Sequence, residues 1–489
     1  MRTGQAAKTA PSPRQDARGV AGDAAGDTGR ETRGVLLTVG IGEILVQLGL
    51  TPVVAVIPGL AAALGVSAAD GAWVLTAFIL ALAGTLLVCG RLGDLIGHRT
   101  MFAWGAIVYA LAGALAGLLA SFPMLLAART LQGVGAAMIS GNNLAILMRA
   151  MPVAKQGRAI AVVAMTSSLA AVLGAGLGTA AVAFGGWPLL FLGPVPLALW
   201  AAIRGRCLPD PPRDRRGRVD WAGAGLLALT AALVAIALNH PHGTTSDVVM
   251  PLFHVAIPVL ALMAAIIFVL VERRVETPLI DWTQLRSRTF AAAIGVNTVL
   301  HLTMMATLFL GPVLIVRGLG QSDAAGGMLM VAVQASVVGT AYLGGWLYDR
   351  TRSRWIRPGA AAILAVGFVA WALSGVASSY AALIAFGLFS GLGSGVLLAV
   401  NNVAVMTGLP DAYRGVASGM LETTRHFGHA FGVTIPTAIV GLVAATTDVG
   451  GDATALRWGF FWSCLGMAVI ACLGILLALA PPRQGSSPT

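Results

Sequence analysis

Ionisable side chains set inside long apolar runs are the residues of this sequence most able to do chemistry. Only two carboxylates lie well within such runs, Glu43 and Glu422. Glu422, His426 and His429 are spaced i, i+4 and i+7, so they would share one face of a helix. An embedded charge costs about 2.5–3.5 kcal/mol on insertion scales, so these residues are functional candidates. A buried carboxylate or histidine there could take up and release a proton.

Each embedded charge also has a plainer explanation. Glu43 could be the structural partner of a nearby arginine, and the Glu422 group could form an ion-paired contact between helices with Arg425. Arg129 is a further embedded charge that needs a partner or a water-filled cavity, and it could simply donate hydrogen bonds to backbone carbonyls. The residues alone leave these alternatives open.

The elements that position these groups are apolar runs of membrane-spanning length. The chain has 489 residues, of which 57% are hydrophobic and 10% charged, whereas soluble domains are about 25% charged. Its mean hydropathy is +0.84. A spanning helix needs about 20 apolar residues, and fourteen such runs predict an all-α membrane protein with 14 transmembrane helices. The runs are Val35–Leu64, Gly71–Cys89, Met101–Ala120, Pro123–Met148, Ala159–Phe184, Trp187–Ile203, Trp221–Leu238, Met250–Val271, Phe290–Val316, Ala325–Leu347, Gly359–Ala377, Tyr380–Met406, Gly415–Ala445 and Trp458–Ala480.

Arginine and lysine concentrate in alternate connections between these runs, the pattern that marks cytoplasmic loops. The sequence therefore predicts that both termini are cytoplasmic, as an even number of spans requires. It also means that the net charge of +11 does not indicate nucleic-acid binding. We expect residues 1–34 and 481–489 to be cytoplasmic tails, the first of them disordered.

A weak internal repeat divides the chain. GRLGD at Gly90–Asp94 is echoed by GWLYDR at Gly345–Arg350, and GVGAAMISGNN at Gly133–Asn143 by GLGSGVLLAVNN at Gly391–Asn402. Parallel repeats of six helices are a transporter architecture. We therefore expect six-helix bundles over residues 35–204 and 289–480. Residues 205–288 would form basic linkers with an inserted helix pair.

Several motifs resemble those of the major facilitator superfamily, and in particular its fourteen-helix drug/proton antiporter branch. GRLGDLIGHRT at Gly90–Thr100 resembles the signature loop between the second and third helices, although Leu95 stands where a basic residue is common. Four further segments resemble motifs of that branch: WVLTAF (Trp73–Phe78), ARTLQGVGAA (Ala128–Ala137), VDWAGAGLLAL (Val219–Leu229) and GVASGMLETTRHFGHAFG (Gly415–Gly432).

The resemblance implies roles for the candidate residues. The first helix of the family lines a central cavity, so Glu43 would bind a proton or a substrate cation, and Arg129 would take part in proton coupling. Glu422, His426 and His429 would form a titratable relay. Polar side chains on the first, fourth, ninth and twelfth helices would line a substrate pocket, although each could instead serve helix packing. These are Gln47, Thr51, Asn142, Asn143, Asn297, His301, Asn401 and Asn402.

The resemblance also implies that the Gly90–Thr100 loop is a conformational clasp. Asp94 would face the positive N-terminal end of the helix that begins near Gly415, whereas a solvated turn is the alternative. The clasp residues would be Gly90, Arg91, Gly93, Asp94, Gly97 and Arg99, with Asp349 and Arg350 in the repeat.

Two departures from the branch bear on proton antiport. The motif of the fifth helix normally has a proline where this chain has Ala175 and a glycine where it has Thr179, and the first helix carries an aspartate at the position of Gly49. Both departures favour uptake or uniport as an alternative to proton-driven export.

We expect a monomeric secondary transporter of a bacterial plasma membrane that exports small amphipathic organic compounds by proton antiport. The proton gradient would supply the energy without a cofactor. The sequence has no metal-ligand spacing, nucleotide-binding loop or clustered catalytic constellation, which argues against an enzyme. A transporter-like membrane sensor is a further alternative, disfavoured because neither tail is long enough to fold as a partner module.

Overall fold

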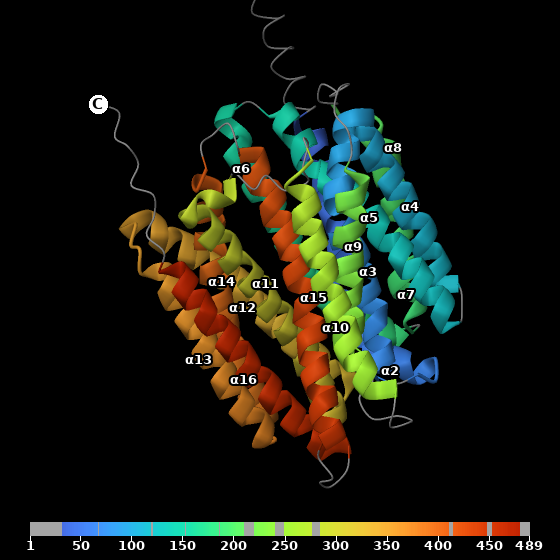
Figure 1. The fold of residues 1–489 in the computed structure, drawn as a ribbon, viewed down its shortest axis with the longest axis vertical. Coiled ribbons are helices and arrows are strands. Elements are labelled where there is room, and N and C mark those ends of the chain that lie inside the picture. The colour runs from blue at the N-terminus through green and yellow to red at the C-terminus, as the bar shows by residue number, and fades with distance from the viewer. Residues whose placement is uncertain are drawn as a thin grey trace, which may run out of the picture.

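The computed structural model describes residues 32–66, 68–118, 121–151, 153–184, 186–209, 220–239, 249–275, 284–409, 414–446 and 452–479. Within those residues the regular structure is entirely helical, and the long helices run roughly side by side (Figure 1). The predicted tails, and most of the linkers on either side of the inserted pair, lie outside the described residues.

The first half of the chain begins with a broken helix. Residues 32–48 are helical and a turn follows at Gly49 and Leu50. Pro52 then sits in the first turn of the next helix, where its missing N–H is tolerated. The helices after the turn are α2 (Thr51–Ala63), α3 (Ala68–Ile96), α4 (His98–Leu118), α5 (Phe122–Ala150), α6 (Val153–Phe184), α7 (Pro188–Leu192) and α8 (Val195–Gly205).

The rest of the chain supplies a helix pair and a second helical group. The pair is α9 (Trp221–Asn239) and α10 (Val249–Glu272). The second group consists of α11 (Arg288–Val313) with the π-helical turn η2 (Leu314–Gly318), α12 (Asp323–Thr351), α13 (Ile356–Val376), α14 (Tyr380–Thr407), α15 (Arg414–Thr446) and α16 (Asp452–Ala478). A short 3₁₀ turn, η1 (Gln284–Arg286), precedes α11.

The all-helical membrane architecture predicted from the sequence is confirmed. Every predicted apolar run coincides with helix in the described residues. Eleven segments are long and apolar enough to cross a membrane, and shorter apolar helices occur at Leu169–Gly178, Trp221–Val234 and Ala256–Glu272.

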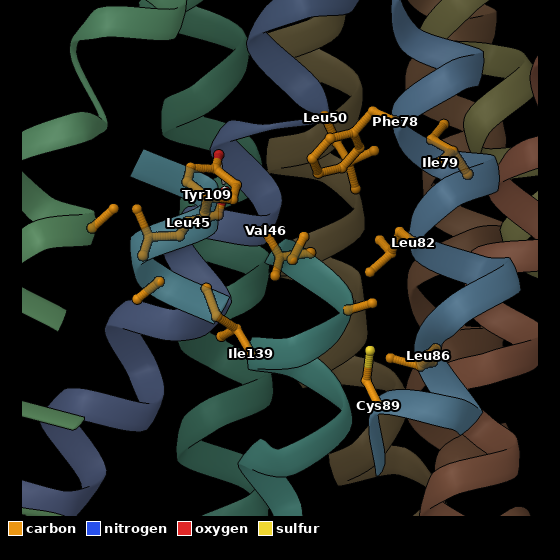
Figure 2. Close-up of a cluster of buried hydrophobic side chains, with 14 of the residues drawn as sticks. Leu45, Val46, Leu50, Phe78, Ile79, Leu82, Leu86, Cys89, Tyr109 and Ile139 are labelled. Atoms are coloured by element: carbon orange, nitrogen blue, oxygen red, sulfur yellow. Dashed lines mark hydrogen bonds between the residues drawn. The ribbon is translucent and has the colours of Figure 1, made fainter. Parts of the chain in front are cut away.

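Two large apolar clusters correspond to the two halves of the chain. One gathers residues of the first helix, α3, α4, α5 and α8, and Figure 2 shows several of these side chains converging between the helices. It also takes in Met305, Leu308 and Phe309 from α11 and Met330 from α12. The second lies entirely within α11–α16. The first cluster therefore joins the halves along an apolar seam.

The halves also touch through two pairs of long helices. α3 packs against α15, and α6 packs against α12. α9 and α10 pack on each other, and α9 contacts both α3 and α15 (Figure 1). The helix pair therefore lies beside one of the two lines of contact between the halves.

The glycines of the internal repeat lie where helices touch. A Cβ at Gly135 would come within 2.6 Å of the Tyr109 backbone nitrogen on α4. In the second half, a Cβ at Gly393 would come within 2.7 Å of the Leu364 nitrogen on α13. Any larger residue would force the helices apart, so these glycines permit close helix contact.

Candidate substrate and proton site

A cavity between the two halves is lined by eight of the thirteen residues predicted for proton coupling or substrate binding. It has two lobes, which share Ser167, Asn402 and Arg425. We call one the carboxylate lobe; its polar lining is Glu43, Ser140, Asn143, Ser167, Asn402, Glu422 and Arg425. We call the other the histidine lobe; its polar lining is Gln47, Thr51, Ser167, His301, Gln334, Asn402, Arg425 and His429.

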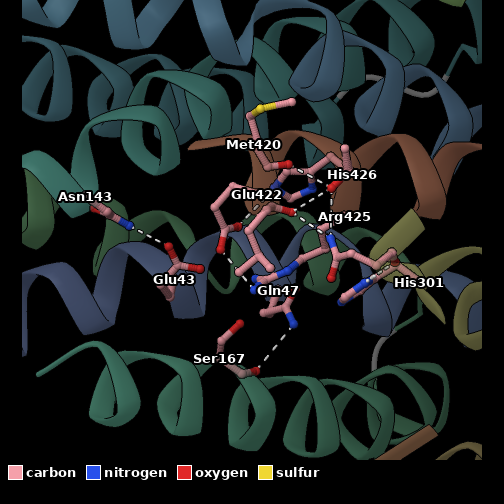
Figure 3. Close-up of polar contacts among 12 residues, drawn as sticks. Glu43, Gln47, Asn143, Ser167, His301, Met420, Glu422, Arg425 and His426 are labelled. Atoms are coloured by element: carbon pink, nitrogen blue, oxygen red, sulfur yellow. Dashed lines mark hydrogen bonds and ion pairs between the residues drawn. The ribbon is translucent and has the colours of Figure 1, made fainter. Parts of the chain in front are cut away.

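The carboxylate lobe brings acids from both halves together. Glu43 is 7% exposed, and its Oε1 accepts a hydrogen bond from Asn143 Nδ2 at 2.7 Å. From α15, Glu422 Oε1 pairs with Arg425 Nη2 at 2.9 Å. Glu43 lies within electrostatic range of both Glu422 and Arg425 (Figure 3). Glu43 on the first half thus faces an ion pair on the second half, with one group that repels it and one that attracts it.

Three histidines lie beside this cluster: His301 and His429 line the histidine lobe, whereas His426 is buried outside the lining of both lobes. The His301 and His429 ring centroids are 5.3 Å apart, and those of His426 and His429 are 6.0 Å apart. His301 Nδ1 is 2.9 Å from the Asn297 carbonyl oxygen, and His426 Nε2 is 3.9 Å from Glu422 Oε2. The helix face predicted to carry Glu422, His426 and His429 thus lies opposite His301 on α11.

Buried polar atoms without a hydrogen-bond partner concentrate around this cavity. Among the described lining residues they include Ser140 Oγ, Asn143 Oδ1, Asn402 Oδ1, Glu422 Oε2 and His429 Nδ1. An unmade hydrogen bond in a low-dielectric interior costs about 1–3 kcal/mol. These atoms are therefore suited to meeting the polar groups of a ligand or of solvent.

The two asparagine pairs divide their roles in the same way. Asn143 and Asn402 line the cavity. Asn142 is fully buried outside the lining, with Nδ2 donating to the Cys89 carbonyl at 3.2 Å. Asn401 is also fully buried, and its Nδ2 donates to the Ala293 carbonyl at 3.0 Å. The first asparagine of each pair thus joins helices, and only the second reaches the cavity.

The remaining predicted pocket residues lie at or beside the histidine lobe. Gln47 Nε2 makes a long contact of 3.4 Å with the Ser167 carbonyl, and Thr51 Oγ1 donates to the Gln47 carbonyl at 3.1 Å. Asn297 is fully buried, outside the lining, and donates to the Leu421 carbonyl and to Thr424 Oγ1, both at 2.9 Å. Asn297 therefore binds α11 to α15.

Arg129 lies apart from the cavity lining in a cage of neutral groups. Its guanidinium is fully buried and donates to the Val74 carbonyl at 2.9 Å, to Gln132 Oε1 at 2.6 Å and to the Gly49 carbonyl at 2.7 Å. The Phe78 ring lies 4.3 Å from the guanidinium carbon. These contacts match the plainer explanation, in which the arginine bonds to backbone carbonyls.

Gly49, where the branch carries aspartate, forms part of that cage. A Cβ there would come within 2.6 Å of the Phe78 ring and 3.1 Å of Tyr109 Oη. Phe78 thus occupies the space that a larger side chain would need. The side chains of Ala175 and Thr179, the other departure, lie outside the described part of the structure.

The loop at Gly90–Thr100 is held by contacts within itself and by contacts to α5, which belongs to the same half of the chain. Asp94 carboxylate oxygens lie 3.1 Å from Arg91 Nη1 and 3.2 Å from His98 Nε2. His98 Nδ1 is 2.8 Å from Asn142 Oδ1. A Cβ at Gly93 would overlap Asn142 Oδ1, and Gly97 has a φ of 110°. The glycines thus permit both the turn and the approach of α5.

The repeated loop is built differently. Asp349 pairs with Arg352 at 3.4 Å, and both side chains are exposed. The Arg350 guanidinium carbon lies 5.5 Å from the Trp346 ring centroid. In the first loop, by contrast, Arg99 lies on the exposed surface and Gly90 packs against the Gly141 carbonyl. The two loops therefore share sequence but not contacts.

Three residues outside the predicted set lie at these sites, and a fourth, Arg425, was expected only as an ion-pair partner of Glu422. Arg425 belongs to both lobes, Ser167 and Gln334 line the cavity, and Gln132 completes the Arg129 cage. The i, i+3 spacing indicated the pairing of Arg425 with Glu422 but not its place in both lobes. Ser167 lies in the polar triplet Thr166–Ser168 and Gln334 on an otherwise apolar stretch of α12, and no family motif marks either.

The sequence profile of the Major Facilitator Superfamily matches residues 39–433. The chain belongs to the major facilitator superfamily. Because this is a family of transporters, the chain is a membrane transporter and no catalytic family is indicated.

Relatives in this superfamily include exporters and a vitamin transporter. The cephamycin export protein CmcT of Amycolatopsis lactamdurans is 29% identical over 91% of this chain and 92% of its own. The riboflavin transporter RibZ of Clostridioides difficile is 24% identical over 81% and 86%. The putative multidrug resistance protein MdtD of Escherichia fergusonii is 25% identical over 93% and 95%. Such bacterial relatives indicate a multi-pass protein of the inner membrane.

Solved transporters share the fold. A bacterial homologue of the human lysosomal transporter Spinster, in an inward-facing unoccupied conformation, aligns with a TM-score of 0.65 at 15% identity, over 92% of this chain and 96% of its own. The human organic anion transporter MFSD10 aligns with a TM-score of 0.58 at 17% identity, over 91% and 99%. At this identity the likeness shows the fold alone.

Proposed function

We propose that this transporter exports small amphipathic organic compounds in exchange for protons, as a member of the fourteen-helix drug/proton antiporter branch. In this proposal the eleven longer spans and the three shorter apolar helices all cross the membrane, and both termini are cytoplasmic. The transporter acts as a monomer, with six-helix bundles over residues 35–204 and 289–480. The export relatives support the direction of transport.

The observation that carries the proposal is the placement of Glu43 opposite the Glu422–Arg425 pair in a single cavity. While Glu43 is ionised, Glu422 repels it and Arg425 attracts it across the two halves. A proton on Glu43 removes both of these interactions between the halves and leaves the Glu422–Arg425 pair within α15 intact. The energy of contact between the halves thus depends on protonation, which is what proton coupling requires.

The rest of the cavity supports a substrate path beside the proton site. The carboxylate lobe includes Leu147 and Met406, near the predicted cytoplasmic ends of α5 and α14. Leu50, Met305 and Leu308 line the histidine lobe and also belong to the apolar seam between the halves. A compound from the cytoplasm would pass the carboxylates and stop at the seam. Rocking of the halves would then open the opposite side.

The test is substrate-driven proton movement in proteoliposomes that hold a pH-sensitive dye. The probes are a lipophilic amine, a neutral flavin and an anionic β-lactam, because relatives carry the names of chemically different substrates. Glu43→Gln and Glu422→Gln should each abolish proton movement. Asp70→Asn, which removes a carboxylate on α3 outside the cavity lining, should retain it. Intact coupling in both glutamine variants would refute the proton assignment.

Uniport or uptake is a second candidate, favoured by the cage around Arg129. Among the described residues no carboxylate bonds to this arginine, and Gly49 stands at the position of the branch aspartate. A uniporter would equilibrate substrate without responding to an imposed pH gradient. Accumulation assayed with the gradient in each direction distinguishes export, uptake and uniport.

A further inference from the structure

A groove on the outer surface lies between the start of α4 and the end of α8, away from the transport cavity. It is lined by Arg99, Thr100, Ala103, Trp104, Ile107 and Arg206. α4 begins at His98 and α8 ends at Gly205, so both arginines lie at the same end of membrane-spanning segments. That end is the cytoplasmic one in the proposed topology.

Local packing builds the groove. A Cβ at Gly205 would come within 2.8 Å of the Phe102 ring, so only glycine lets the end of α8 approach α4 this closely. The chain then turns, which places Arg206 beside the first turn of α4. Arg99 enters the same groove from α4. Two cationic groups are thereby fixed on two packed helices.

The chemistry of the groove changes along its length. Its end at the membrane surface carries Arg99 and Arg206, and none of its described lining residues is acidic. Trp104 is 57% exposed, as expected for an indole at a membrane–water interface. Deeper along α4, Leu111 is 58% exposed, and on α8 the exposed surface runs from Ile203 in the last turn inward to Leu199, which is 46% exposed. A cationic head end therefore leads onto an apolar surface.

We propose that this groove binds an anionic phospholipid of the cytoplasmic leaflet. The lipid phosphate lies between Arg99 and Arg206, whose planar guanidinium groups suit phosphate oxygens. Trp104 packs against the glycerol region, and an acyl chain follows the exposed residues of α4 and α8. Basic sites between helices at the cytoplasmic side are suited to anionic headgroups. A free anion would make no use of the apolar surface, so a lipid is the occupant that matches both ends.

The test is lipid retention measured by native mass spectrometry on full-length protein in neutral detergent. Phosphatidylglycerol should bind in preference to phosphatidylcholine of the same chain length. Arg206→Gln should weaken phosphatidylglycerol binding about fivefold, as expected for one basic residue near the headgroup. Arg204→Gln is the matched control: it removes an exposed arginine two residues away that does not line the groove.

Further variants separate the headgroup from the chain contact and protect against misfolding. Arg206→Lys should keep part of the preference for phosphatidylglycerol, and Trp104→Ala should weaken binding of both lipids. Equal losses in Arg206→Gln and Arg204→Gln would show only a diffuse surface charge and overturn the proposal. So would equal binding of the two lipids, or displacement of the lipid by millimolar inorganic phosphate. Unchanged melting temperatures would show that the variants remain folded.

Discussion

Replacement of Arg129 separates a structural role for this residue from a role in proton coupling. The guanidinium makes three hydrogen bonds, to backbone carbonyls of Val74 and Gly49 and to the Gln132 side chain, and it stacks on Phe78. Arg129→Lys keeps the positive charge but replaces a planar fork by a compact ammonium. The three acceptors lie around the guanidinium, each bonded to a different nitrogen. A single ammonium group cannot reach all three, so we count two of the three hydrogen bonds as lost.

The size of the effect follows from those contacts. Hydrogen bonds between membrane helices average about 0.6 kcal/mol and reach about 1.7 kcal/mol. Two lost bonds therefore reduce the free energy of unfolding by about 1–3 kcal/mol. Arg129→Met should cost more, because it leaves Gln132 Oε1 buried without a donor.

The assay is thermal unfolding of purified protein followed by tryptophan fluorescence, run beside the proteoliposome proton assay. We expect Arg129→Lys to lower the melting temperature by about 1–3 °C while proton movement remains in the molecules that stay folded. Arg204→Lys, at an exposed position, is the control for the chemical change. A variant that melts like the wild type but moves no protons would refute the structural role.

Three other predictions follow from the site. Gly49→Asp should lower the yield of monodisperse protein in size-exclusion chromatography, because its Cβ would meet Phe78 at 2.6 Å; adding Phe78→Ala should restore the yield, and failure to do so would place the clash elsewhere. Asn401→Leu should lower the melting temperature through loss of its 3.0 Å bond to Ala293 but leave the transport KM unchanged, whereas Asn402→Leu should raise the KM with little effect on melting; the reverse pattern would contradict the division of roles within the pair. Asn142→Leu should lower the melting temperature by removing the partner of His98 Nδ1, and an unchanged value would show that this contact does not hold the loop.

The helices were predictable because their signal is strong and local. Long apolar runs leave no other structure that satisfies the backbone in a bilayer, and each predicted run proved to be helical. The face shared by Glu422, His426 and His429 was also predictable, because helix periodicity fixes it. These features depend only on residues within one run.

Contacts between runs were less accessible from the sequence. Asn142 and Asn143 are neighbours of the same type, yet only Asn143 reaches the cavity. The difference arises because a helix turns by about 100° per residue, so adjacent side chains face different neighbours. Arg129 similarly required knowledge of where the Gly49 and Val74 carbonyls lie. Neither position is recorded in the pattern of a single helix.

The position of α9 makes the two lateral contacts between the halves unequal. α9 packs on both α3 and α15, whereas in the described residues neither helix of the pair packs substantially on α6 or α12. In a bilayer, lipid tails would be kept from the α3–α15 contact but would reach the α6–α12 contact. A membrane-dissolved compound would then enter the protein laterally at the α6–α12 contact. The inserted pair would thereby confine lateral entry to one side of the transporter.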